Sequence, residues 1–98
     1  LGVIDCLEAA LTCPWDEYLA WIATLEAGSD ARRKMEGVPK YGEIVIDFNH
    51  VQMLARAFDE ARAAQTPQQQ EWSKLMLSML YDIHQESAIY LMVRRLRD

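Results

Sequence analysis

The sequence predicts a mainly α-helical fold: a small bundle of four to five helices in a single domain over residues 1–98, with a long C-terminal helix and one short β-strand as an option. Three observations support this prediction. Glycine and proline are scarce, with four and three occurrences, which favours helices over turns. Signals typical of helix starts recur along the chain. No glycine or proline follows Pro67, so the last third of the chain can form one continuous helix.

Two helices are expected in the N-terminal third. Asp5 and Glu8 have the spacing of a capping box, which predicts a first helix over about residues 6–11. Pro14 suits the first position of a second helix, because the amide hydrogen that proline lacks has no partner there. Gly28 is typical of the residue that follows a helix end. We therefore expect the second helix to end shortly before Gly28.

A short third helix and a loop should come next. Ser29 or Asp30 can cap a helix that runs to about Glu36, and a glycine follows it directly. Residues 37–42, Gly-Val-Pro-Lys-Tyr-Gly, combine two glycines with a proline. Such a combination is typical of a loop, so we expect an exposed connection here.

A short strand is the main departure from a helical pattern. Residues 43–48 contain three β-branched residues in a row, which favours extended structure. A strand needs a partner for its backbone groups, and residues 1–5 are one candidate because they also contain Val-Ile-Asp. A strand at 88–93 that pairs with 44–47 is another candidate, and that pairing would change the fold class to α+β. The segment could instead pair with a second copy of the chain or form an extended lead-in to the next helix.

The C-terminal half should hold two helices. Asn49 and Gln52 have capping-box spacing, which predicts a helix over about 50–65. Thr66, followed by Pro67 and then Gln69, combines an N-cap, a first-turn proline and a capping-box glutamine. This is the most specific local signal in the chain.

The last helix could extend from 67 to 98. It would then be roughly 45 Å long, whereas a compact domain of this size is about 33 Å across. We therefore expect it either to break near 84–87 or to protrude. Its segment 75–81 is apolar nearly all round, and a helix of this kind is buried on every side. A homodimer would cover it most easily.

Composition limits the classes of partner. Acidic residues outnumber basic ones by 15 to 10, for a formal net charge of −5, so the chain as a whole is repelled from nucleic acid. No apolar run reaches the roughly 18 residues of a membrane span. Cys6 and Cys13 are too far apart on one helix for a disulfide and lack zinc-site spacing. Reduced thiols predict a reducing, cytoplasmic location.

No set of residues in the sequence is typical of catalysis. His84 lies close to two carboxylates in the sequence, but residues two apart point to different helix faces. His50 has no metal-ligand partner at a suitable spacing. Cys13 precedes a helix start, which can lower a thiol pKa, although a semi-buried structural role is the plainer interpretation. We therefore expect no enzyme, no metal and no cofactor.

The resulting hypothesis is a small interaction module, such as an adaptor, regulator or inhibitor, that acts through helix faces. Closely spaced aromatic residues on one short helix cannot all face a small core, and tryptophan and tyrosine are favoured at interfaces. The methionine-rich helix could form a core, a dimer seam or a groove, of which a core is the first expectation. The candidate interaction residues are Trp15, Tyr18, Trp21, Asp16, Glu17, Trp72, Met76 and Met79.

Two alternatives come from other functional classes. The first is a small helical enzyme or ligand-binding protein with a pocket beside the methionine-rich helix. The second is a nucleic-acid-binding regulator that would use the basic clusters at 32–34 and 94–97.

Overall fold

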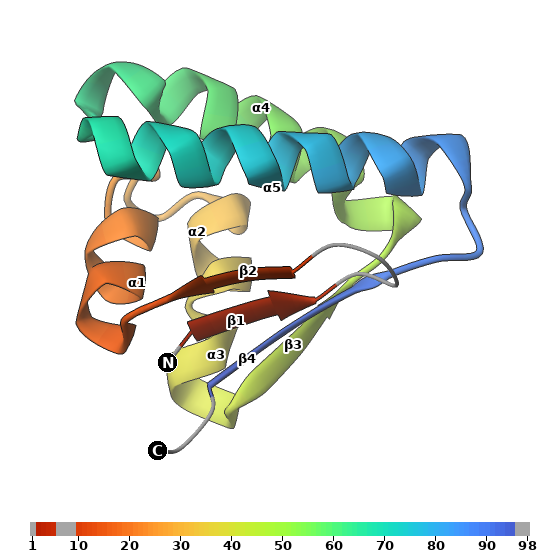
Figure 1. Ribbon diagram of the computed structural model, residues 1–98, viewed down its shortest axis with the longest axis horizontal. Helices are drawn as coiled ribbons and strands as arrows, with labels where there is room; N and C mark the ends of the chain where they lie inside the picture. Colours follow the sequence, from red (N-terminus) through yellow and green to blue (C-terminus); the bar gives the residue numbers. More distant parts are fainter. Residues whose placement is uncertain (1, 6–9, 96–98) are drawn as a thin grey trace.

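The computed structural model describes residues 2–5 and 10–95, and it combines helices with one antiparallel sheet (Figure 1). The sheet has four strands in the order β2-β1-β4-β3. All three neighbouring pairs are antiparallel. The strands are β1 Gly2–Asp5, β2 Ala10–Cys13, β3 Glu43–Ile46 and β4 Leu91–Arg95.

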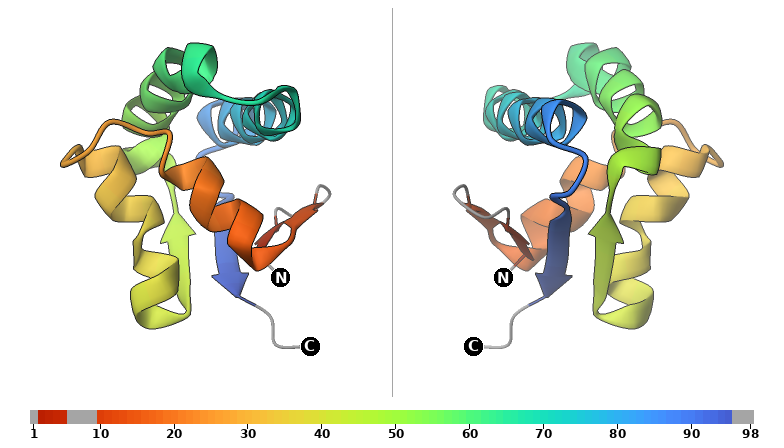
Figure 2. Two further views of the ribbon diagram at one scale, coloured as in Figure 1. Left: turned by 90° about the vertical axis from the view of Figure 1, so that its left-hand side faces the viewer. Right: turned by 90° about the vertical axis from the view of Figure 1, so that its right-hand side faces the viewer.

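Helices account for most of the described chain, as the sequence predicts. The longest of them is close to the C-terminus and lies alongside α4 (Figures 1 and 2). Two short 3-10 turns, η1 Phe48–His50 and η2 Arg62–Ala64, flank α4. The five α-helices are α1 Trp15–Ile22, α2 Asp30–Met35, α3 Gly37–Tyr41, α4 Val51–Ala61 and α5 Pro67–Gln85. The predicted helical predominance and the long late helix are therefore confirmed.

The sheet is larger than the single strand expected. The proposed pairing of 44–47 with 88–93 is present, since Ile44 lies opposite Val93 and Ile46 opposite Leu91. Segment 1–5 contributes β1, which pairs with β4 and β2 rather than with β3. The α+β alternative therefore describes the sheet correctly.

The prediction of a first helix over 6–11 is wrong at the end of that range. Residues 10 and 11 belong to β2, while 6–9 lie outside the described residues. Local capping-box spacing at Asp5 and Glu8 favours a helix, but β1 fills the place between β2 and β4. Hydrogen bonding on both sides of a strand outweighs such a local preference.

The prediction of a loop at 37–42 is also wrong, because this segment forms α3. Pro39 lies in the first turn of this helix, where its missing amide hydrogen has no intrahelical partner in any case. Gly42 ends the helix with φ +88°. A Cβ on Gly37 would come within 2.6 Å of Ile44 Cγ2, so the absence of a side chain lets α3 pack closely on β3.

The last helix ends well before the end of the chain. It spans 19 residues, or ~28 Å, which fits within the 32 × 31 × 24 Å extents of the molecule. The chain leaves helix geometry at Glu86, at the expected break near 84–87, and continues into β4. Its apolar middle is buried on one side only, since Leu75 and Tyr81 are 50% and 61% exposed.

The helix caps confirm two of the local predictions and contradict a third. Thr66 and Gln69 form the predicted capping box, and Ser29 accepts the Arg32 amide hydrogen, as expected of an N-cap. The predicted Asn49–Gln52 box is wrong. Asp47 and His50 form the box instead, because the chain enters a 3-10 turn before α4 begins.

Trp21 lies at the centre of the core and is fully buried. Its indole N–H donates to Ser73 Oγ at 3.0 Å, and the Ser73 hydroxyl donates to Gln65 Oε1 at 2.7 Å. The Gln65 amide in turn donates to Thr24 Oγ1 at 3.0 Å. A hydrogen-bonded chain therefore joins α1 to α5 through the residues that precede α5.

Replacing the serine of this chain should destabilise the protein. In Ser73→Ala the buried indole N–H of Trp21 and the side-chain oxygen Oε1 of Gln65 lose their hydrogen-bond partner. This loss lowers the free energy of unfolding by about 1–3 kcal/mol. Urea denaturation measures this cost. Ser78→Ala removes an exposed serine from the same helix and should change stability by less than about 0.5 kcal/mol. Equal effects of the two substitutions would contradict the role of Ser73.

Candidate protein-interaction groove

Most of the predicted interaction residues lie inside the protein. Tyr18, Trp21 and Met76 are fully buried, Met79 is nearly so, and Trp72 is only 9% exposed. The expectation that the methionines belong to the core is therefore confirmed. As surface residues these five are corrected by the structure, because their side chains are buried where α1, α4 and α5 pack together.

The first turn of α1 holds the remaining predicted residues. Trp15 is the most exposed of the aromatic group, yet its ring stacks on Tyr18 at 5.4 Å. The Arg95 guanidinium lies 4.4 Å from the centre of the same ring. Asp16 and Glu17 are exposed. The two carboxylates are thus the part of the predicted surface that a partner can reach in this conformation.

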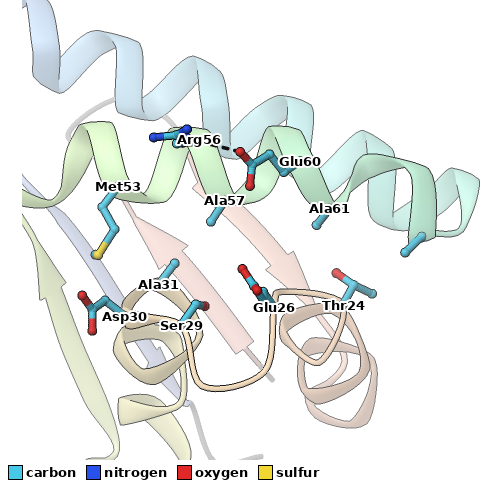
Figure 3. A pocket seen from close by; sticks show the side chains of 11 residues that line it. Thr24, Glu26, Ser29, Asp30, Ala31, Met53, Arg56, Ala57, Glu60 and Ala61 are labelled. Atoms are coloured by element: carbon cyan, nitrogen blue, oxygen red, sulfur yellow. Dashed lines mark hydrogen bonds and ion pairs between the residues drawn. The ribbon is translucent and has the colours of Figure 1, made fainter.

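A groove elsewhere on the surface is a better-formed site. It lies between the α1–α2 connection and α4, and its volume is about 670 Å³ (Figure 3). This volume lies within the range typical of ligand pockets. We call it the α2–α4 groove. Its lining comprises Thr24, Glu26, Ser29, Asp30, Ala31, Met53, Arg56, Ala57, Glu60, Ala61 and Ala64.

Local hydrogen bonds hold the first wall of the groove in place. Gly28 has φ +78°, a conformation that favours glycine, and it turns the chain toward α2. Ser29 caps α2 by accepting the Arg32 amide hydrogen at 3.2 Å. The Arg32 guanidinium donates to the Leu25 carbonyl at 3.4 Å. The connection is therefore tied to α2 by two hydrogen bonds.

Small side chains on α4 and η2 make the second wall shallow. Met53, Ala57 and Ala61 follow one another at four-residue spacing, which places them on one helix face. Ala64 continues this row in η2. The four-residue spacing of Ala57 and Ala61 is the signal in the sequence for this wall.

The rim of the groove is charged. Glu26 and Asp30 lie on the first wall, and Glu60 and Arg56 lie on α4 (Figure 3). Arg56 Nε is 3.2 Å from Glu60 Oε1, and both side chains are well exposed, at 82% and 63%. Three carboxylates against one guanidinium leave the lining with an excess of negative charge.

The groups considered for catalysis lie apart from this groove. His50 Nδ1 accepts the Asp47 amide hydrogen at 3.1 Å as part of a helix cap. His84 stacks with Phe48 at 6.0 Å, beside a smaller cavity of about 220 Å³. Among the described residues, no cluster of three or more histidines, cysteines and carboxylates could hold a metal ion.

Cys13 is buried, and its chemistry differs from that of a reactive thiol. Loss of hydration on burial, with a smaller contribution from the negative charge of Glu17, raises the pKa of the Cys13 thiol to about 11. The lowering of the thiol pKa that a helix start can cause is therefore not found, in agreement with the plainer structural interpretation. At neutral pH this sulfur is protonated and is a poor nucleophile.

Taken together, these features define a small protein that combines helices with one antiparallel sheet and carries an open groove on its surface. The chain belongs to the family described as formate hydrogenlyase maturation protein HycH, whose model matches residues 1–95.

Three proteins to which the chain is similar come from Escherichia coli. Formate hydrogenlyase maturation protein HycH of strain K12 is 89% identical over 98 residues, which cover 100% of this chain and 72% of the relative. The protein of the same name from strain O157:H7 matches equally well. Hydrogenase-4 component J of strain K12 is 47% identical over 96 residues, covering 98% of the chain and 69% of that protein. No solved structure matches.

Family membership bears on one of the sequence predictions. The family description names a maturation role, and the prediction that the chain is not an enzyme is confirmed at this level. Within residues 2–5 and 10–95, no helix is both long and apolar enough to cross a membrane.

Alkaline pH should weaken the fold through Cys13. The thiol ionises near pH 9 when exposed and near pH 11 when folded, so the unfolded chain loses its proton first. The free energy of unfolding should fall between about pH 9 and 11, by on the order of 2 kcal/mol. Urea denaturation of the wild type and of Cys13→Ala across this range measures the effect. An equally steep decline in both proteins would show that Cys13 does not cause it.

Proposed function

We propose that this protein is a non-catalytic assembly factor that binds a hydrogenase subunit of formate hydrogenlyase while that complex matures. The observation that carries the proposal is the family match over residues 1–95, together with the 89% identity to the E. coli maturation protein. A cytoplasmic location, expected from the composition, belongs to the same proposal.

The surface of the chain supports a binding role of this kind. An assembly factor must release its client, so its contact surface should be moderate in size and partly polar. The α2–α4 groove meets both conditions, because small apolar side chains form its floor and charged side chains form its rim. The exposed carboxylates of Asp16 and Glu17 offer a second, acidic contact.

Complementation in E. coli tests this function. In a strain that lacks its own HycH, the gene that encodes this chain should restore hydrogen production from formate. An affinity tag on the protein should also retain a subunit of formate hydrogenlyase, identified by probing for each subunit in turn. The tagged protein should retain the subunit because binding to the immature subunit is its proposed activity.

Two results would contradict the proposal. One is a lack of hydrogen production although the protein accumulates in its folded form. The other is restored production without any formate hydrogenlyase subunit bound to the tagged protein, even after chemical cross-linking. A matched strain that carries the E. coli relative serves as the positive control.

The homodimer expected from the sequence remains a separate prediction. The support left to it is the exposed apolar surface of α5, where Leu75 and Tyr81 face outward. Light scattering on a sizing column across a range of concentrations should give the mass of two chains. In Leu75→Glu the mass should fall to that of one chain, because a charge would then be buried at the seam. A wild-type mass of one chain at every concentration would exclude the homodimer.

A further inference from the structure

We infer that the α2–α4 groove receives a lysine or arginine side chain of the bound hydrogenase subunit, held between Glu26 and Glu60 with its aliphatic stem over Ala57 and Ala61. This inference rests on the proposed function and specifies the chemistry of the contact. A basic, partly helical or extended segment of the client is the occupant that fits.

Two carboxylates face one another across the groove. Glu26 projects from the α1–α2 connection, and Glu60 projects from α4 on the opposite wall, where it pairs with Arg56 (Figure 3). Like charges that converge on an open space repel one another, and a cation between them removes that repulsion. A guanidinium or ammonium group is therefore the complementary partner.

The existing ion pairs at the rim do not prevent this contact. Arg56 and Glu60 form a pair on the surface, with side chains 82% and 63% exposed. Asp30 and Arg33 form another pair, with side chains 76% and 69% exposed. Exposed pairs of this kind contribute little to stability, so an incoming cation can replace either one. Glu26 forms no ion pair with any residue that the structure describes.

The floor of the groove suits the rest of a long basic side chain. Lysine and arginine carry three or four methylene groups that favour apolar contact while the charge stays hydrated. Ala57 and Ala61 offer methyl groups at this point, and Ala61 is only 8% exposed. Larger residues here would fill the groove and leave no room for the stem.

A nucleic acid is a poorer occupant of the same groove. The three carboxylates of the lining would repel phosphate groups. The other two basic residues of α2, Arg32 and Lys34, are absent from the lining, and Arg33 is engaged by Asp30. The rim therefore selects a basic segment of protein.

Charge removal tests the inference on the complete protein. Glu26→Gln and Glu60→Gln should each weaken binding to the purified formate hydrogenlyase subunit by about fivefold, and the double variant by more than tenfold. The salt dependence of binding should also become shallower. Glu71→Gln neutralises an exposed carboxylate on α5, outside the groove, and should leave the affinity unchanged.

A steric pair provides an independent test. Ala57→Leu should fill the floor of the groove and weaken binding by about tenfold. Ala63→Leu enlarges an exposed residue of η2 that does not line the groove, and it should bind as the wild type does. Thermal denaturation of each variant establishes that the fold is retained.

The outcomes separate this inference from the proposed function. If the wild type binds a subunit and the double glutamine variant binds it equally well, the basic contact is overturned while the proposed function stands. If Ala57→Leu weakens binding while the glutamine variants do not, a neutral segment fills the groove. That result also overturns the basic contact. If the wild type binds no subunit at all, the proposed function fails.

Discussion

The burial of Trp21 is the interaction on which the rest of the structure depends. Its ring lies 6.3 Å from that of Tyr18, 5.2 Å from Phe58 and 5.8 Å from Trp72. These contacts bring α1, α4 and α5 together around one side chain. The hydrogen bond from its indole to Ser73 fixes the ring within this arrangement. Truncation of a buried residue of this size typically costs about 3–5 kcal/mol, a large part of the stability of a small domain.

The position of one wall of the groove depends on hydrogen bonds that reach this core. Thr24 donates its hydroxyl to the Trp21 carbonyl at 2.6 Å and accepts from the Gln65 amide at 3.0 Å. It also lines the groove, so one end of the first wall is attached directly to the core. The α1–α2 connection then crosses opposite the alanines of α4. A preformed binding surface of this kind loses little conformational entropy when a partner docks.

Local chemistry was predictable, whereas long-range pairing was predicted only in part: the pairing of 44–47 with 88–93 was proposed and is present. The cap at Thr66 needs only residues within one turn, and the structure has it as the sequence predicts. Strand β1 pairs with β4, which lies almost 90 residues further along the chain, so no local pattern could show that β4 is its partner. Tyr18 and Trp21 failed as surface candidates because helices distant in sequence cover them. The groove was missed for the same reason, since its two walls belong to separate segments.

Hydrogen–deuterium exchange tests most directly whether the α2–α4 groove is the contact surface for the client. The protein alone would be compared with its complex with the purified formate hydrogenlyase subunit. The account predicts slower exchange of backbone amides at 26–31 and 53–64 on binding, with little change at the first turn of α1. Protection confined to residues 15–19, or to the strands β3 and β4, with an unchanged groove would contradict it.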